Sequence, residues 1–312
     1  MLHPDLDRAV RLLRAGRLVA IPTETVYGLA ANALDPVAVE RLFAAKGRPH
    51  TSPLIVHVPS IEMARSLAAD WPPSAQLLAE RFWPGPLTII VSKKPVIPDV
   101  VTAGLPTAGL RIPRHPVALD LLRAAGIPLA APSANLFTQL SPTTAEHVRA
   151  GLGSRADLVL DGGPCQVGIE STVVSLAVNP PLLLRPGMIP RAEIEAIAGP
   201  ISTPNSLVST PGSLDRPGTP QPSPGMHPRH YSPRTPFYLF PMDPTPPGRG
   251  VTLRRSDMPS TPDAYAAALY PTLHRLDAEG WDWIAIEAPE NTAAWTAILD
   301  RLQRAATPPR PY

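Results

Sequence analysis

The stretch RLVAIPTETVYG (residues 17–28) places an apolar run directly before a group of polar side chains. The run from Leu18 to Ile21 is typical of a buried strand, because it is short, apolar and ended by a proline. Two threonines, one carboxylate and one tyrosine ring follow it. Since open α/β sheets bind ligands just beyond the ends of their strands, this stretch predicts a ligand-binding edge.

Similar apolar runs alternate with helical patterns up to about residue 199. The strand-like runs are PLIVHV, PLTIIVS, AGLRIP, IPLAAPSA, ADLVLDGG and STVVSLAV. The expected helices lie at 36–45, 60–69, 74–82, 116–125 and 143–151. This alternation predicts an α/β catalytic domain over 1–199, with a twisted, open and largely buried sheet.

The remaining third of the chain divides into an arm and a small domain. Residues 200–236 hold ten prolines among 37 positions, which predicts a proline-rich linker or lid. Residues 237–312 return to the pattern, with FYLF, GVTLRR and DWIAIEA as strands and helices near 262–278 and 291–305. They predict a small C-terminal α/β domain of Rossmann-like type.

Bulk properties restrict the function. The chain has 312 residues, a formal net charge of +2 and one cysteine, Cys165. A nearly neutral chain does not indicate stable nucleic-acid binding through overall charge, and one cysteine forms no internal disulfide or cysteine-rich metal site. No apolar run approaches the roughly 20 residues that span a bilayer, and the N-terminus lacks the apolar core of a signal peptide. We expect a cytoplasmic protein without membrane contact.

Positive charge is concentrated locally. Residues 41–52 contain three cations and no acid, and residues 81–115 contain five cations against Asp99 alone. Lysine and arginine together suit a polyphosphate, so the clusters predict a large basic cavity for an anion. The hydroxyl and amide groups of Ser133, Asn135 and Ser141 are suited to contact phosphate or a hydrated Mg²⁺.

Several common catalytic motifs are missing from the sequence. There is no Walker A motif and no GxGxxG, so neither a P-loop nor a dinucleotide fold is supported. The nucleophile motif GxSxG and the metal motif HExxH are missing too. We predict no metal bound directly by protein side chains.

Taken together and in order, the motifs resemble those of the threonylcarbamoyl-AMP synthase family, in its long form with a proline-rich arm and a C-terminal domain. The matching segments are IPTETVYGLA, AAKGRPHTSPLIVHV, FWPGPLTIIV, GLRIPRHP, APSAN, SPTTAEHV, DGGPCQVGIESTVVSL, LLRPGMI and SPGMHPRHYSP. The resemblance implies synthesis of threonylcarbamoyl-AMP from L-threonine, bicarbonate or CO₂, and ATP, with Mg²⁺ accompanying ATP and pyrophosphate released. It also implies downstream partners, the enzymes that transfer the threonylcarbamoyl group to tRNA.

The resemblance also implies site residues. The expected threonine site is Thr25, His57, Arg111, Ala131 and Ser171. The expected ATP site is Lys46, Arg48, Ser52, Thr107, Ser133, Asn135, Ser141 and Arg185, with Tyr231 reaching in from the arm. Among these, Lys46, Arg48 and Arg111 are the expected catalytic residues. Phe137 and Thr138 depart from the family pattern, which often reads Ser-Gly there, and we expect them to stiffen the loop before Ser141.

Two other functions fit part of the pattern. A non-catalytic binding module for tRNA or double-stranded RNA would also use a basic cavity, although few aromatic residues are interspersed among the cations to stack bases. A carbamoyl-transferring relative that uses carbamoyl phosphate with ATP would bring further modules, whose cysteines this sequence does not supply.

Overall fold

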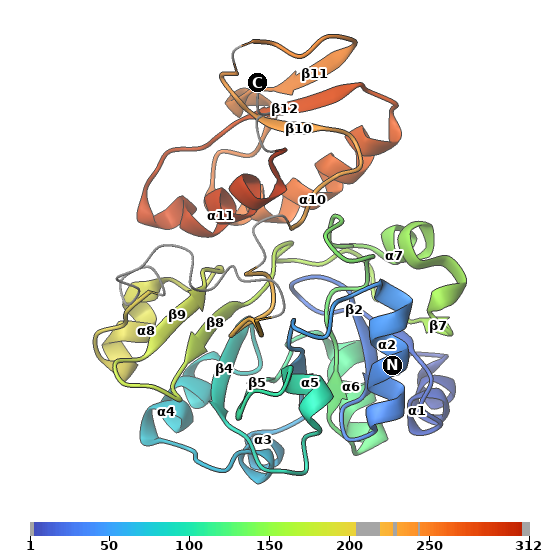
Figure 1. Ribbon diagram of the computed structural model, residues 1–312, viewed down its shortest axis with the longest axis vertical. Coiled ribbons are helices and arrows are strands. Elements are labelled where there is room, and N and C mark those ends of the chain that lie inside the picture. Colours follow the sequence, from blue (N-terminus) through green and yellow to red (C-terminus); the bar gives the residue numbers. More distant parts are fainter. Residues whose placement is uncertain (1–2, 204–218, 227–229, 243, 308–312) are drawn as a thin grey trace.

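The chain folds into a large and a small α/β unit stacked along the long axis of the molecule (Figure 1). The computed structural model describes residues 3–203, 219–226, 230–242 and 244–307. One sheet of nine strands lies in the large unit and one of three strands in the small unit. The predicted fold class, an open-sheet α/β domain followed by a smaller α/β domain, is confirmed.

The large unit is a mixed sheet with helices on both faces. Its strands are β1 (Val19–Ile21), β2 (Gly28–Asn32), β3 (Ile55–His57), β4 (Leu87–Ser92), β5 (Thr107–Arg111), β6 (Leu129–Ala130), β7 (Leu158–Val159), β8 (Thr172–Ser175) and β9 (Leu182–Arg185). Its helices are α1 (Leu6–Arg14), α2 (Pro36–Lys46), α3 (Ile61–Leu67), α4 (Pro73–Phe82), α5 (Asp99–Thr102), α6 (Pro116–Ala125), α7 (Ala145–Leu152) and α8 (Arg191–Ala198). The strand order is β7-β1-β2-β6-β3-β5-β4-β8-β9.

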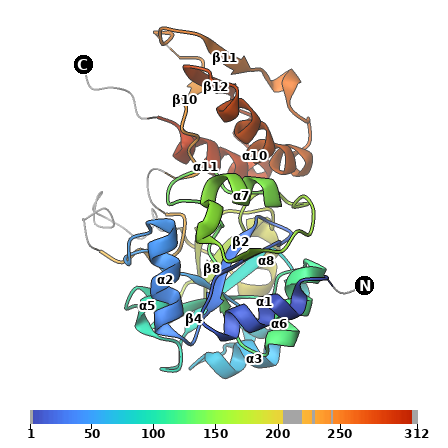
Figure 2. The same ribbon diagram turned by 90° about the vertical axis from the view of Figure 1, so that its right-hand side faces the viewer.

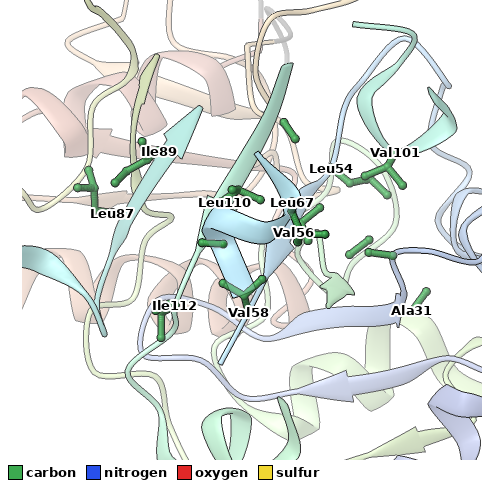
Figure 3. Close-up of a cluster of buried hydrophobic side chains, with 14 of the residues drawn as sticks. Ala31, Leu54, Val56, Val58, Leu67, Leu87, Ile89, Val101, Leu110 and Ile112 are labelled. Carbon is green, nitrogen blue, oxygen red and sulfur yellow. The ribbon is translucent and has the colours of Figure 1, made fainter. Parts of the chain in front are cut away.

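Side chains along each strand point alternately to the two faces of the sheet, so the core is divided into two layers. Val19 and Ile21 of β1 belong to the cluster packed under α1 and α6, whereas Leu18 and Ala20 belong to the cluster packed under α2. Figure 2 shows these helices on opposite sides of the sheet. Figure 3 shows the second cluster, to which the central strands contribute residues such as Val56. Successive side chains of β1 therefore point to opposite faces of the sheet and are buried on both, as expected for a sheet covered on each side by helices.

The ends of α2 position two of the predicted catalytic residues. Asp35 caps the helix by accepting a hydrogen bond from Val37 N (2.9 Å), and Pro36 occupies its first turn. Gly47 follows in the left-handed conformation (φ 60°), which suits glycine and ends the helix. Lys46 thus forms the last helical position, and Arg48 turns back so that its backbone N donates to Phe43 O.

The small unit is an all-parallel sheet with two helices against the large unit. Its strands are β10 (Phe237–Phe240), β11 (Gly250–Leu253) and β12 (Trp283–Glu287), in the order β10-β12-β11. Its helices are α10 (Pro262–Ala278) and α11 (Thr296–Ala305), which face the nine-stranded unit (Figure 1). The last helix starts later than the expected residue 291, because a 3₁₀ turn at Ala293–Trp295 precedes it.

One apolar cluster joins the two units. It contains Leu269, Tyr270 and Leu302 from the small unit together with Val26 and Ile169 from the large one. Buried apolar surface shared in this way makes the interface resemble the core of a domain. The expected domain limits at 199 and 236 stay a prediction.

The described parts of the arm cross the large unit. Gln221 N donates to Thr51 O (2.8 Å), and Ser232 N donates to Thr138 O (2.9 Å). Residues 204–218 and 227–229 of the predicted arm lie outside the described residues, as do residues 308–312 of the expected C-terminal domain.

The interface contains a histidine whose neutral form the fold favours. His274 of α10 stacks on His147 of α7 with ring centroids 3.9 Å apart, and its Nε2 lies 3.1 Å from Ser141 O. Burial and the neighbouring His147 lower the pKa of His274 to about 4. Unfolding therefore takes up a proton once the pH falls below about 6.5, the ordinary value.

We predict that acid weakens the fold partly through His274. Its stabilising contribution is complete above the unfolded pKa and is lost as the pH falls from about 6.5 to about 4, with a slope of up to about 1.4 kcal/mol per pH unit. His274→Gln removes this titration and should flatten the pH dependence of the free energy of unfolding, measured by denaturant titration. Equal slopes in the two proteins would contradict the prediction.

Candidate functional site

A cavity lies between the ends of several strands of the large sheet and the described part of the arm. Nine of the residues predicted from the sequence line it: Thr25, Arg48, His57, Arg111, Ala131, Ser133, Ser171, Arg185 and Tyr231. They come from segments up to about 200 positions apart in the sequence. The fold therefore brings most of the predicted threonine and ATP residues into one wall.

The opening stretch forms one side of this cavity through a tight turn. Thr23 Oγ1 donates to Val26 O (2.6 Å) and lies 2.8 Å from Thr25 Oγ1. Glu24 turns away from the cavity, where its Oε2 accepts a hydrogen bond from Arg114 N (3.0 Å). Tyr27 donates its hydroxyl to Gly163 O (2.8 Å). Glu24 and Tyr27 therefore shape the loop, while Thr23 and Thr25 face the ligand space.

Arg111 ends β5 inside this wall and is held from two sides. Its Nη2 donates to Thr25 Oγ1 (3.0 Å) and lies 2.8 Å from Glu24 Oε1, and its Nε donates to Gly85 O (3.2 Å). The side chain is 5% exposed. Such bonds offset part of the cost of burying the charge and fix the direction of the guanidinium.

His57 lies beside Arg111, because β3 and β5 pair in parallel with these two residues in register. Burial, reinforced by the charge of Arg111, lowers the pKa of His57 to about 3. The imidazole is therefore neutral at physiological pH and can accept as well as donate a hydrogen bond.

Two further guanidinium groups form the other side of the cavity. Arg185 donates from Nε to Ser171 O (3.0 Å), from Nη2 to Ser171 Oγ (3.1 Å) and from Nη1 to Pro224 O of the arm (3.2 Å). Arg48 donates to Ser52 Oγ and to Pro53 O (2.9 Å). Burial lowers the pKa of Arg48 to about 10, which still leaves it charged at neutral pH.

Lys46 lies behind the wall rather than in it. Its Nζ donates to the carbonyl oxygens of Ser133 and Asn135, and the residue is 2% exposed. Burial, together with the nearby charge of Arg48, holds the pKa of Lys46 well below its ordinary value. In this geometry Lys46 shapes the Ser133 loop, and its expected contact with phosphate stays a prediction.

Four other predicted residues also stand outside the cavity wall. Ser52 supports Arg48, and Thr107 lines a smaller neighbouring cavity together with Pro222 and Pro224. Asn135 lies on the far side of its loop, where its Nδ2 donates to Leu136 O and Gln139 O. Ser141 donates its hydroxyl to Glu170 Oε1 (2.6 Å).

Nine residues that were not predicted also line the cavity, among them Thr23, Glu170, Gly225 and His230. All of them lie within the sequence motifs quoted above. The sequence therefore identified these segments as part of the site, but not these side chains. Glu170 was missed because a carboxylate in a basic, anion-binding cavity runs against the charge argument. Burial alone would raise the pKa of Glu170, but Arg301, Arg185 and the hydrogen bonds it accepts hold that pKa below its ordinary value.

No metal-binding cluster of three or more His, Cys, Asp or Glu side chains occurs among the residues described. Glu170 is the carboxylate in the cavity wall, and Arg301 already pairs with it. The residues present therefore suit a cation that arrives on phosphate oxygens better than one held by carboxylates. Within the same described part of the chain, no helix is both long and apolar enough to cross a bilayer.

Comparisons with known proteins identify the family of the chain. A family profile described as "Telomere recombination" matches residues 11–187, and one described as "Threonylcarbamoyl-AMP synthase, C-terminal domain" matches residues 189–307. The chain belongs to the threonylcarbamoyl-AMP synthase family. The resemblance seen in the sequence is thereby confirmed, and with it the expectation of an enzyme.

Two relatives with this family name match almost the whole chain. The Pyrococcus abyssi threonylcarbamoyl-AMP synthase is 39% identical over 96% of this chain and 93% of its own length. The Bacillus subtilis one is 41% identical over 97% of this chain and 93% of its own length. A crystal structure of P. abyssi Sua5 complexed with L-threonine has a TM-score of 0.88 at 38% identity, covering 96% of this chain and 94% of that one.

We predict that Gly225→Ala disturbs the arm without unfolding the large unit. Gly225 has φ 83°, which side chains rarely adopt, and an added Cβ would lie 2.3 Å from the hydroxyl of Tyr231. Backbone amides at 230–232 should therefore exchange hydrogen faster, as measured by mass spectrometry. The control Gly151→Ala, in α7 with open space around it, should leave their exchange unchanged. Unchanged exchange in Gly225→Ala would contradict the prediction.

Proposed function

We propose that this chain joins L-threonine, bicarbonate or CO₂, and ATP into threonylcarbamoyl-AMP, with release of pyrophosphate. The observation that carries the proposal is the set of three buried arginines, Arg48, Arg111 and Arg185, around one cavity that also presents Thr25 and a neutral His57. Such a wall suits a ligand with one carboxylate and several phosphates.

Threonine would bind at the Arg111 end. Nη2 of Arg111 is already engaged by Thr25 and lies against Glu24, so a carboxylate would meet Nη1 or take the place of Thr25. The substrate hydroxyl can hydrogen-bond to neutral His57 or to Ser171. The small side chain of Ala131 leaves room for the methyl group.

ATP would bind between Arg48 and Arg185, with Tyr231 against it. Both guanidinium groups are oriented by hydrogen bonds to the protein before any ligand arrives. Groups that need no reorganisation stabilise developing charge more effectively than mobile ones. Arg48 and Arg185 would therefore favour departure of pyrophosphate, and Mg²⁺ on the phosphates would offset part of their charge.

The chemistry needs no covalent bond to the enzyme. The neutral amine of threonine attacks the carbon of CO₂, and loss of one proton leaves a carbamate. A carbamate oxygen then attacks the α-phosphorus of ATP, and the bond to the bridging oxygen breaks as pyrophosphate leaves. Holding the reactants in line can supply roughly 7 to 11 kcal/mol of the barrier reduction. The mixed anhydride formed must be consumed by a group-transfer enzyme, for which we propose the machinery that modifies tRNA in the cytoplasm.

The RNA-binding alternative is not favoured. Arg48, Arg111 and Arg185 are each no more than 6% exposed. A duplex or loop of RNA contacts an exposed basic surface, which these buried side chains do not provide.

We predict that pyrophosphate release requires all three substrates. Wild-type protein with Mg-ATP should release pyrophosphate only when L-threonine and bicarbonate are both present, and AMP should leave joined to a threonylcarbamoyl group. Coupled pyrophosphate detection and mass spectrometry measure the two products. Release of pyrophosphate without threonine, or with carbamoyl phosphate in place of bicarbonate, would refute the proposed reaction.

We also predict that Arg111 and Arg48 affect different substrates. Arg111→Ala should chiefly raise KM for threonine, because losing the partner of a buried carboxylate costs roughly 2 to 5 kcal/mol. Arg48→Ala should chiefly raise KM for ATP. The exposed Arg123→Ala on α6 is the control and should change neither value. Equal changes in both KM values for both cavity variants would contradict this division.

A further inference from the structure

A charged residue of the C-terminal unit is buried against the cavity wall. Among the described residues, Arg301 of α11 is the largest side chain that is fully buried. Its Nε lies 2.9 Å from Glu170 Oε2, its Nη2 donates to Glu170 O (3.2 Å) and its Nη1 donates to Pro186 O (2.9 Å). Three bonds from one guanidinium thus reach across the interface into the large unit.

Glu170 links Arg301 to the cavity. It lines the cavity directly, and its Oε1 accepts the hydroxyl of Ser141. Tyr270 of α10 also donates to Glu170 Oε2 (3.2 Å). Ser171, the next residue in the chain, holds Arg185 through its carbonyl and its hydroxyl. The Glu170 carboxylate therefore connects two predicted ATP residues, Ser141 and Arg185, with helices α10 and α11 of the small unit.

The same helix end also holds the described arm. His230 N donates to Arg304 O (3.0 Å), and Arg304 Nη1 donates to Met226 O (3.1 Å). The guanidinium of Arg301 lies 5.3 Å from the centre of the Tyr231 ring. Helix α11 thus contacts both the fixed wall and the arm side of the cavity.

Charge explains why this pair matters for an anionic ligand. An unpaired Glu170 in the wall would repel the phosphates that Arg48 and Arg185 attract, and it would also be a buried charge without compensation. A well-packed apolar pair of similar volume would stabilise the interface about as well as the ion pair does. Stability alone therefore gives no reason for placing an arginine and a glutamate here.

We propose that Arg301 is a positioning residue of the nucleotide site, which neutralises Glu170 and keeps Ser141 and Arg185 in place, so that the C-terminal unit completes the cavity in which ATP binds. The inference rests on the proposed function, since it takes ATP as the ligand of this cavity. It assigns the C-terminal unit a part in binding the nucleotide through Glu170, although none of the unit's described residues lines the cavity.

The test compares binding of the two substrates, which needs no turnover. Arg301→Met keeps most of the volume and removes the charge, leaving Glu170 unpaired. Calorimetry should show the Kd for Mg-ATP raised about tenfold or more, while the Kd for L-threonine changes by less than about threefold. A structural defect alone would weaken both ligands alike. Equal changes in the two Kd values, or none in either, would overturn the proposal.

A second substitution in the same protein isolates the charge. Glu170→Gln keeps an oxygen that can accept from Ser141 but carries no charge. The double variant Arg301→Met with Glu170→Gln should therefore bind Mg-ATP about tenfold more tightly than Arg301→Met alone. A double variant no better than the single one would overturn the neutralising role. Arg275→Met, which removes an exposed cation of α10, is the matched control and should bind both ligands as the wild type does.

Hydrogen exchange tests the positioning role of Arg301 independently of the binding measurements. If Arg301→Met does not fold, Arg301→Lys keeps the charge with fewer bonds and should raise only the Kd for Mg-ATP, by a smaller factor. In either folded variant, amides at 138–141 and 168–172 should exchange faster than in the wild type, and those of β1 and β2 should not. Uniform or unchanged exchange would overturn the positioning role. A wild type that binds Mg-ATP without making product would refute the reaction and leave this inference standing.

Discussion

The interior of the protein holds more positive than negative charge, and this excess has to be compensated by the surrounding chain. Among the described residues, five cations are buried, namely Lys46, Arg48, Arg111, Arg185 and Arg301, against the two buried carboxylates Glu24 and Glu170. Each cation is expensive to remove from water unless oxygens surround it. The loops around the cavity supply these oxygens, mostly as backbone carbonyls. Positive charge therefore remains in excess inside the protein, and the phosphates of the proposed ATP ligand would offset it.

The need to surround the buried cations with oxygens explains the shape of several loops, which strand propensity does not explain. The loop after β6 curves so that two of its carbonyl oxygens meet Lys46 Nζ, and residues 52–53 fold back onto Arg48. Pro224 of the arm offers its carbonyl to Arg185. These segments contain many prolines and so lack some N–H donors, but every proline keeps a carbonyl acceptor. A proline-rich arm suits a site that needs acceptors for arginine and few donors.

The sequence predicted features that depend on neighbouring residues better than contacts between residues far apart in the chain. Local patterns place α6 at 116–125 and α10 at 262–278, because apolar periodicity and a first-turn proline are read within one helix. The resemblance to the family implied that Thr25, Arg111 and Ser171 share one site, and each lies beside the end of a strand: Thr25 after β1, Arg111 at the end of β5 and Ser171 directly before β8. The contact of Glu170 with Arg301 did not, because 131 positions separate the two residues. Nor does a lysine in a motif reveal whether its Nζ will meet a ligand or, as at Lys46, two carbonyls of its own chain.

The arm shows how these contacts are tied to binding. Tyr231 has a left-handed backbone (φ 63°), which costs a bulky residue of order 1 to 3 kcal/mol, yet it is 1% exposed. Such strain persists only where neighbours compensate for it, and the ring lies against His230, Tyr270 and Arg301. Two of these three neighbours belong to the C-terminal unit. Any ligand that moves the Tyr231 ring therefore also disturbs the packing of α10 and α11. A ligand that moved the ring would in this way couple binding in the cavity to the contact between the two units, and the strain at Tyr231 would reduce the free energy needed to move it.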